Sequence, residues 1–478
     1  MELRFYNTLN RCLEEFTPIQ QGVARMYTCG PTVYNFAHIG NFRAYLFEDI
    51  LRRVLKFCGY QVVQVMNLTD IDDKTIRDSQ ASGMALNDFT AQYKAAFFDD
   101  LKTLRVEPAE HYPAATDHIP EMISLIEKLM EKGYGYVGED GSVYFSIRKF
   151  GDYGRLARID LEGQRVGVRI QADEYEKDQA ADFALWKKWD EADGDVGWDS
   201  PWGKGRPGWH IECSAMSMKY LGNHFDLHTG GVDNMFPHHE DEIAQSEAAT
   251  GEPFVNYWLH CEHLMVNNSK MSKSAGNFFT LRDLLNGGYS GREVRWLLMS
   301  AHYRQKLNFT YTAGSDGRPV RFDGLDNARI AIRRVDEFAC RLRGLTESVS
   351  ICMGETLAET GLRKFRHAVE DDLNISGALG ALFEMIRDAN RAMDSGLLGR
   401  KGAERILALL YEFDTVLGVL DLDSASDIAP AEVLALAEER KQARKNKDFA
   451  RSDQIRDQLK EMGWEVKDTP EGPKVTKL

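Results

Sequence analysis

The sequence has no run of about 18 or more apolar residues, so nothing in it predicts a helix that spans a membrane. It has 7 cysteines, an odd number, and no two of them form a C-x-x-C pair. These features predict reduced thiols and a cytoplasmic setting. The first residues also lack the basic and apolar regions of a secretory signal peptide, which supports the same expectation.

The sequence contains neither an internal repeat nor a low-complexity tract. Its 478 residues are too many for one compact core, and we expect about two to four domains. A hydrophobic content of 43% and a charged content of 28% are ordinary for a soluble globular protein. The formal net charge of −15 argues mildly against a nucleic-acid partner, although a local basic stripe can bind one while the whole chain stays acidic.

Hydrophobic patterns near the N-terminus predict a strand, a helix and a second strand at residues 24–29, 41–57 and 61–66. This order is typical of the first unit of an α/β fold with a doubly wound, Rossmann-like parallel sheet. Ligands bind such sheets beyond the carboxyl ends of the strands. Three residues with suitable chemistry fall at these ends: Cys29, His38 and Thr69.

The pattern changes after residue 106. A helix, a hairpin signal at 139–141 and an acidic stretch with tryptophans predict an insertion between two halves of the sheet domain. Helical spacing then dominates from about residue 319 to 420, which predicts a helical bundle. The expected domains are the first half of the sheet domain (1–106), a connective insertion (107–205), the second half (206–250), a region with a lysine-containing loop (251–318), the helical bundle (319–420) and a small C-terminal α/β domain (431–478).

Two stretches far apart in the sequence have the composition of phosphate-binding sites. The first, His38–Asn41 (H-I-G-N), stands where a strand should give way to a helix, whose N-terminus has unpaired N–H groups and a positive dipole end. The second, Lys270–Ser274 (K-M-S-K-S), carries two ammonium groups on a glycine-adjacent loop that can close on a triphosphate. Taken alone the first motif is weak, and the alternative for the second is a solvated basic turn.

A metal site is one interpretation of four further side chains. His238 and Glu242 lie four residues apart, so a helix would place both on one face. Cys29 and Cys213 each adjoin a predicted strand end or helix start, one in each half of the sheet domain. If the two halves pair around a switch in strand order, all four side chains converge. On spacing alone, a buried cysteine and a capping histidine remain the default interpretation.

Two further segments each admit two interpretations. His260, Cys261 and His263 form a competing set of ligands, but on a strand the alternation of side chains would separate His260 from the other two. The acidic segment Thr69–Lys74 suits a helix N-cap and first turn, or it places Thr69 at the rim of a substrate pocket.

Five segments, taken together and in order, resemble one family. They are Tyr27–Tyr34, His38–Arg43, Thr69–Lys74, Gly208–Ser214 and Phe236–Glu240. With the K-M-S-K-S loop, they resemble the cysteinyl-tRNA synthetases of class I, in which asparagine is usual at the position of Asn41. The resemblance covers nearly the whole chain. It implies a doubly wound catalytic domain with an inserted subdomain, and ATP-dependent ligation of L-cysteine to tRNA(Cys) through cysteinyl adenylate.

The resemblance also implies roles for individual residues. His38 and Lys273, assisted by Lys270, would stabilise negative charge on the phosphates of ATP, which Mg²⁺ accompanies. The implied ATP-binding residues are His38, Gly40, Asn41, Lys270 and Lys273. The implied ligands of one zinc ion per chain are Cys29, Cys213, His238 and Glu242. The implied cysteine pocket consists of Thr69, Trp209, His228 and Asp233.

The C-terminal third resembles the tRNA-binding parts of the family. Residues 251–318 would form a region that contacts a stem of tRNA, the bundle would bind tRNA, and 431–478 would bind the anticodon. Trp464 either stacks on a splayed base or packs under a terminal hairpin. Nothing in the sequence suggests an obligate dimer, so we expect a monomer.

Three other functions differ from this one in features that the sequence contains. A related ligase that passes cysteine to a small amino-sugar acceptor shares the zinc site and both signatures, but lacks the long helical and basic C-terminal part. A non-catalytic RNA-binding relative would have lost lysines or metal ligands, all of which are present here. A zinc hydrolase needs an H-E-x-x-H helix or a comparable base, which His238–Glu242 does not provide.

Overall fold

The computed structural model describes residues 2–158, 182–271, 277–314, 319–346, 353–422, 431–446, 448–469 and 472–477. The chain divides into two compact units. The sheet unit comprises Met1–Arg329, Gly361–Glu384 and Phe413–Val419. The helical unit comprises Ile330–Thr360, Met385–Glu412 and Leu420–Leu478.

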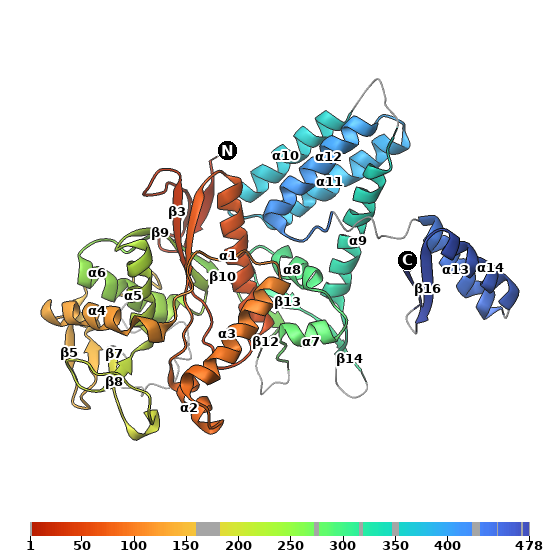
Figure 1. The fold of residues 1–478 in the computed structure, drawn as a ribbon. Helices are drawn as coiled ribbons and strands as arrows, with labels where there is room; N and C mark the ends of the chain where they lie inside the picture. Colours follow the sequence, from red (N-terminus) through yellow and green to blue (C-terminus); the bar gives the residue numbers. More distant parts are fainter. Residues whose placement is uncertain are drawn as a thin grey trace. The chain divides into compact units, whose positions relative to one another are not determined.

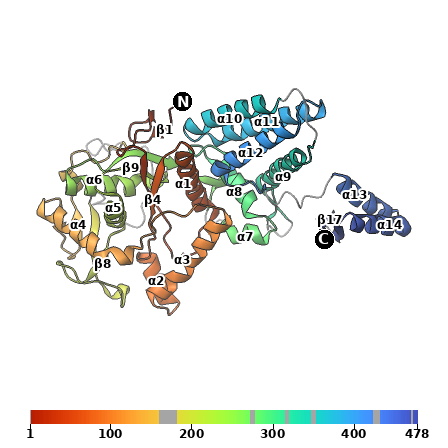
Figure 2. The same ribbon diagram turned by 45° about the horizontal axis from the view of Figure 1, so that its top comes forward.

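A parallel four-stranded sheet forms the centre of the sheet unit. Its strands, in the order β10-β9-β3-β4, are Val255–Cys261, Phe225–Gly231, Val23–Thr28 and Gln61–Met66. The pairing of β3 with β9 aligns Tyr27 with His228, so the two sequence halves of the sheet join side by side. Helix α1 (Ile39–Phe57) covers one face, and α5 (Trp209–Leu221) and α6 (Glu240–Thr250) cover the other (Figures 1 and 2). The predicted doubly wound fold is confirmed.

Two hydrophobic clusters hold these layers together. One contains Tyr27 and Val65 of the sheet with Ile211 of α5 and Ile243 of α6, all at most 1% exposed. The other contains residues of α1 such as Phe42 with residues of α3 (Leu86–Thr103), α7 (Leu281–Asn286) and α8 (Gly291–Ser300). Burying a large apolar side chain stabilises a fold by roughly 1.5–3 kcal/mol, so both faces of the sheet are firmly covered.

The stretch between the two halves of the sheet forms a second, antiparallel sheet of order β5-β6-β7-β8. Its strands are Gly135–Val137, Val143–Phe145, Phe183–Lys188 and Gly205–Pro207. The predicted hairpin is confirmed as β5 and β6, with Gly141 at φ 83° in the turn. The other elements before residue 205 are β1 (Arg4–Asn7), β2 (Cys12–Glu15), α2 (Asp73–Ala81), α3 (Leu86–Thr103) and α4 (Ile119–Glu131).

Short strands and helices follow β10. They are β11 (Leu264–Val266), β12 (Ser269–Lys270), α7 (Leu281–Asn286), α8 (Gly291–Ser300), β13 (Leu307–Phe309), β14 (Tyr311–Ala313) and β15 (Pro319–Phe322). The helical stretch that the sequence predicts from about residue 319 begins at Asp323, because residues 319–322 pair with β14 as a strand.

The later helices are α9 (Asp323–Arg343), α10 (Gly354–Glu370), α11 (Ile375–Asp394), α12 (Arg400–Leu417), α13 (Ala431–Lys445) and α14 (Phe449–Glu461). A terminal hairpin follows, formed by β16 (Trp464–Thr469) and β17 (Gly472–Lys477). Trp464 is only 6% exposed and packs with Ile455 and Leu459 of α14. Packing under the hairpin is therefore the correct interpretation of Trp464, and base stacking is not.

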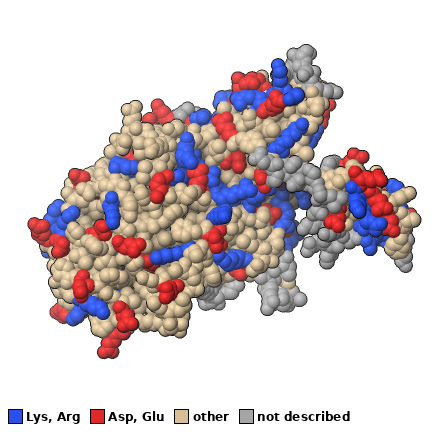
Figure 3. Space-filling model, viewed as in Figure 1, with Lys and Arg blue, Asp and Glu red and all other residues tan. Residues whose placement is uncertain are grey.

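Acidic and basic side chains are interspersed over the face seen in Figure 3, without a single continuous acidic patch. Among the described helices, none is long and apolar enough to cross a membrane. The cysteines that the structure describes are free thiols.

Candidate active site and metal-binding cluster

Four side chains that the sequence singles out as metal ligands come together beyond the end of β3. Cys29 directly follows β3, Cys213 lies on the second turn of α5, and Glu242 lies in the first turn of α6. His238 belongs to the short turn Met235–His239 that leads into α6. One ligand atom of each residue lies within 4.8 Å of every other, so the cluster can hold a metal ion.

Burial and the close contacts within the cluster shift the pKa values of its thiols and its carboxylate. Burial raises the pKa of Cys213, but its hydrogen bond with Cys29 and the charge and hydrogen bond of His238 together lower the pKa to about 6. That hydrogen bond, together with burial, raises the pKa of Cys29 well above its usual value. Burial raises the pKa of Glu242, but the charges of His228 and His238 lower it to about 2. A cation would thus find the thiolate of Cys213 and the carboxylate of Glu242 already favoured, and it would have to displace the proton of Cys29.

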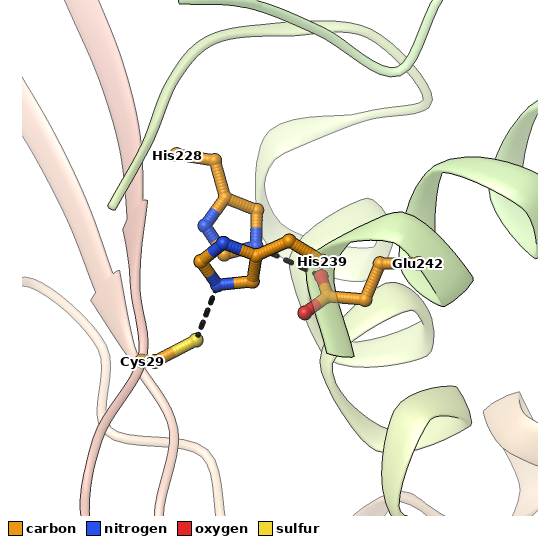
Figure 4. Close-up of side chains that lie close together, drawn as sticks. All are labelled: Cys29, His228, His239 and Glu242. Carbon is orange, nitrogen blue, oxygen red and sulfur yellow. Dashed lines mark hydrogen bonds and ion pairs between the residues drawn. The ribbon is translucent and has the colours of Figure 1, made fainter. Parts of the chain in front are cut away.

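A second set of side chains shares Cys29 and Glu242 with the first. Nε2 of His228, on β9, lies 2.8 Å from Oε2 of Glu242. Nε2 of His239 lies 3.3 Å from Sγ of Cys29, and Figure 4 shows both imidazole rings between Cys29 and Glu242. The ligand atoms of this set also lie within 4.8 Å of one another. His239 is not among the predicted site residues, although its position next to His238 could have indicated it.

The competing ligand set around His260 does not assemble. Neither group of potential ligands among the described residues contains His260, Cys261 or His263. Nε2 of His260 lies 2.8 Å from Nδ1 of His239, so His260 contacts a neighbour of the cluster and not the cluster itself. Cys261 lies against α1, where burial raises the pKa of its thiol to about 12. As alternation along a strand predicts, Cys261 and His260 lie on opposite sides of β10.

Two residues expected in a cysteine pocket contact the cluster directly. Trp209 stacks on His238 with ring centroids 4.2 Å apart, and it stays 40% exposed. His228 is fully buried and contacts Glu242. The exposed indole thus lies over the cluster, and the buried imidazole lies beneath it.

The other two expected pocket residues lie further out. The hydroxyl of Thr69 donates to Oε2 of Glu212, 3.0 Å away, and Glu212 adjoins Cys213 in α5. Asp233 is exposed on the loop after β9, and a Cβ on Gly231 would clash with its carboxylate. Glycine therefore lets this carboxylate lie over the strand end. Burial raises the pKa of Glu212 well above its usual value, and the sequence analysis did not single out this residue.

The first phosphate-binding motif caps α1. His38 is the N-cap, and its Nδ1 accepts a hydrogen bond from the backbone N–H of Asn41 at 3.1 Å. Oδ1 of Asn41 accepts one in return from the backbone N–H of His38 at 3.1 Å, which completes a reciprocal capping box. A Cβ on Gly40 would lie 2.9 Å from Nδ1 of His38, so only glycine leaves room for this cap.

The lysine-containing loop returns to the same helix start. The backbone N–H of Ile39 donates to the carbonyl of Phe279 at 2.9 Å, so the segment after the loop adjoins the cap of α1. Lys270 is exposed on β12 at the start of the loop. Lys273 lies outside the described residues. The segment that follows the second signature in the sequence thus lies beside the first signature.

Comparisons with known proteins agree with this geometry. The family model for the class I (C) tRNA synthetase catalytic domain matches residues 15–316, a DALR domain model matches 364–421, and a model of the cysteinyl-tRNA ligase anticodon binding domain matches 427–473. The fold is similar to that of Mycobacterium tuberculosis methionyl-tRNA synthetase in complex with methionyl-adenylate. The TM-score is 0.57 at 14% identity, over 84% of this chain and 90% of that chain. The catalytic-domain match and the fold define a class I tRNA synthetase.

Curated relatives narrow this class. The cysteine–tRNA ligase of Protochlamydia amoebophila is 48% identical over 478 residues, which cover 99% of this chain and 98% of the relative. That of Brachyspira hyodysenteriae is 50% identical over 482 residues, which cover 99% of both chains. The chain belongs to the cysteine–tRNA ligase family.

Proposed function

We propose that this chain ligates L-cysteine to tRNA(Cys) in two steps. In the first step the carboxylate of cysteine attacks the α-phosphorus of ATP, and pyrophosphate leaves from cysteinyl adenylate. In the second a hydroxyl of the terminal adenosine of tRNA attacks the acyl carbon, and AMP leaves. The observation that carries the proposal is the full-length identity of 48–50% to relatives named cysteine–tRNA ligase.

The start of α1 and the lysine-containing loop would hold ATP. His38, Gly40 and Asn41 present the N-terminus of α1 to the phosphates, and His38 donates to a phosphate oxygen. Lys270 and Lys273 neutralise charge that builds on the α-phosphate, with Mg²⁺ on the phosphates of ATP. Because cysteine supplies its own carboxylate, no protein nucleophile takes part.

Zinc is the metal that suits the cluster, at one ion per chain. Two thiols, an imidazole and a carboxylate are ligands that zinc accepts, and Oε1 of Glu242 is buried without a hydrogen-bond partner. We assign Cys29, Cys213, His238 and Glu242 as its ligands. When bound, zinc supplies a soft Lewis acid that prefers thiolate to hydroxyl and favours loss of a thiol proton.

The pocket would select cysteine by chemistry rather than by size. A methylene-scale difference in a pocket changes binding by only about 1–3 kcal/mol, which is too little to reject serine and other small amino acids. Thr69, Trp209, His228 and Asp233 would orient the amino acid, with Trp209 covering the cluster. Such discrimination removes the need for a hydrolytic editing domain.

The remaining domains would bind tRNA. We assign 1–106 and 206–250 to the two halves of the catalytic domain, 107–205 to its insertion and 251–318 to contact with a stem of tRNA. The bundle 319–420 and the domain 431–478 would contact the rest of tRNA, the latter at the anticodon. The anticodon-domain match at 427–473 supports tRNA as the acceptor over a small amino sugar. We also propose that the protein is a monomer and that it acts in the cytoplasm.

The test is cysteine-dependent exchange of pyrophosphate into ATP, run beside serine, with zinc content measured on the same sample. We expect exchange with cysteine only, at one zinc per chain, followed by charging of tRNA(Cys). Exchange without charging of tRNA(Cys) would favour the related ligase that passes cysteine to a small amino-sugar acceptor. Absence of exchange at full zinc content would overturn the catalytic proposal.

A further inference from the structure

A row of buried side chains leads from the insertion to the metal-binding cluster. The hydroxyl of Tyr153 donates to Oδ1 of Asp241 at 2.5 Å. Oδ2 of Asp241 lies 3.2 Å from Nε2 of His210, and Nδ1 of His210 lies 2.9 Å from Nδ1 of His238. Nε2 of His238 faces the cluster, 2.9 Å from Oε1 of Glu242. The last member of the row is therefore one of the four ligands assigned above.

The contact between the two imidazoles holds one proton. Two ring nitrogens 2.9 Å apart form a hydrogen bond only if one carries hydrogen and the other does not. When Asp241 is ionised, its carboxylate only accepts hydrogen bonds, and it then selects the form of His210 with hydrogen on Nε2. Nδ1 of His210 is then the acceptor, and Nδ1 of His238 must be the donor. In a neutral imidazole this leaves Nε2 of His238 with a free lone pair.

We propose that Tyr153, Asp241 and His210 are positioning residues that fix His238 in the tautomer whose Nε2 can bind a metal. The inference rests on the proposed metal site and extends it to residues outside the ligand set. Partners of this kind, on the far ring nitrogen of a metal-binding histidine, change metal affinity by about 10–100-fold when removed.

The insertion segment that carries Tyr153 is itself held on the first turn of α6. The backbone N–H groups of Gly154 and Ala157 donate to the carboxylate of Glu240 at 2.9 and 2.8 Å. Arg155 forms an ion pair with Glu247 at 2.5 Å. These contacts fix the hydroxyl of Tyr153 relative to the helix that carries Glu242, so the insertion supports the metal site although it supplies no ligand.

Three consecutive carboxylates of α6 thus have separate partners. Glu240 binds the backbone of the insertion, Asp241 binds Tyr153 and His210, and Glu242 belongs to the cluster. Glu240 and Asp241 are both buried, at 0% and 1% exposure. This arrangement provides a matched control, because Glu240→Gln removes a neighbouring charge in the same turn without touching either histidine.

The experiment measures zinc affinity of the full-length protein by competition with a chromogenic chelator. For Asp241→Asn we expect a 10–100-fold weaker affinity for Zn²⁺, because the amide N–H₂ can donate to Nε2 of His210 and reverse the proton order. For Glu240→Gln we expect a smaller loss than for Asp241→Asn, because its amide oxygen keeps one of the two backbone hydrogen bonds to the insertion and neither histidine loses a partner. Nitrogen chemical shifts of zinc-loaded, ¹⁵N-histidine-labelled protein should show hydrogen on Nδ1 of His238.

Two results would overturn the inference while the metal site stands. One is equal zinc affinity of Asp241→Asn and Glu240→Gln. The other is a zinc-loaded protein in which Nδ1 of His238 carries no hydrogen. If Asp241→Asn does not fold, Tyr153→Phe is compared with Tyr144→Phe, whose hydroxyl binds Asp140 instead, and equal affinity of these two variants overturns the inference.

A separate variant tests whether the four assigned residues bind the metal. Cys213→Ser removes an assigned ligand and should abolish stoichiometric zinc. If Cys213→Ser keeps its zinc, the assigned ligand set is wrong, whatever the result for Asp241.

Discussion

Gly40 lies where the backbone of α1 passes closest to the imidazole of His38. In Gly40→Ala the new methyl group would lie 2.9 Å from Nδ1, so the ring must leave its capping position. We expect cysteine-dependent pyrophosphate exchange to fall roughly tenfold or more, because a small misplacement of a reacting group is costly. Exchange kinetics on the purified variant measure this.

The control for Gly40 is Gly380, an exposed position inside α11 with no atom within 4 Å of a new Cβ. Gly380→Ala should stabilise the protein by about 0.5–1 kcal/mol, since alanine loses less conformational freedom in a helix. Its exchange rate should not change. Equal rates for both variants would show that the cap of α1 is not part of the ATP site.

Cys261 is a buried thiol near the candidate active site, and we expect burial to make it unreactive. It is 3% exposed, and burial raises its pKa to about 12. We expect iodoacetamide at pH 8 to modify the exposed Cys12 of the native protein and to leave Cys261 unmodified, because the thiolate is the nucleophile. Peptide mapping by mass spectrometry checks this, and unfolding in urea should make Cys261 reactive. Labelling of Cys261 in the native state would contradict the burial.

At this scale the sequence predicted four side chains that the structure brings together, and it missed the residues that contact them. Cys29, Cys213, His238 and Glu242 were predicted as a ligand set by the resemblance to a family, since spacing alone favoured a buried cysteine and a capping histidine. His210 and Asp241 could not be predicted, because their roles depend on which ring nitrogen faces which neighbour. That is decided by the packing of Tyr153 from a distant segment.

A buried ion pair joins two helices of the sheet unit. Asp49 of α1 and Arg295 of α8 are at most 1% exposed, and Nη2 of Arg295 lies 2.6 Å from Oδ2 of Asp49. Nε of Arg295 also donates to the carbonyl of Leu417 at 2.6 Å. Asp49→Asn leaves the guanidinium buried without its charge partner, which should lower the free energy of unfolding by about 3–5 kcal/mol at pH 7.

This pair should also make stability depend on pH. Burial raises the pKa of Asp49, but the charges of Arg295 and Arg53 outweigh burial and hold the pKa below its usual value. A carboxylate of this kind stabilises fully above its unfolded pKa of about 3.9, and the stabilisation is lost as pH falls through the folded pKa. The difference in free energy of unfolding between wild type and Asp49→Asn should therefore be constant above about pH 5 and narrow below about pH 4.

Urea titrations at several pH values measure that difference. Asp78→Asn is the control, because Asp78 pairs with Arg77 at the surface, where the arginine side chain is 68% exposed. Such a pair contributes at most about 1 kcal/mol. A difference for Asp49→Asn that widens towards low pH would contradict the assigned sign.

The elements of the sheet unit followed from sequence because their apolar patterns are strong. The predicted strand 61–66 matches β4, and the predicted helix 41–57 lies within α1. Later patterns were less reliable: residues 319–322 form a strand, because pairing with β14 satisfies their backbone groups. Ile330 is 59% exposed although it fits a helical apolar pattern with Val335 and Phe338, both of which are buried.

Over the whole molecule, basic groups of the C-terminal helices are paired with acids. Lys441 lies 3.1 Å from Glu438, Arg451 lies 2.7 Å from Glu439, and Arg440 is only 6% exposed. On the proposed function, tRNA phosphates that bind these helices would compete with these carboxylates. Because each phosphate contact releases counterions, we expect the affinity for tRNA to fall at least tenfold between about 50 and 200 mM salt.

Pyrophosphate exchange should change much less over the same range, since its substrates are held inside the sheet unit. Filter binding of tRNA and exchange assays in the same buffers compare the two. Equal salt sensitivity of both would place the dominant tRNA contacts at the active site and not on the C-terminal helices.

The pairing of β3 with β9 has a consequence for how the protein is made. Cys29 leaves the ribosome early, but Cys213, His238 and Glu242 follow only after the whole insertion has been synthesised, and β10 comes last. The metal-binding cluster cannot exist on a shorter nascent chain. On the proposed metal site, the zinc content of a purified sample would therefore report the pairing of β3 with β9, and a chain interrupted before α6 should emerge without metal.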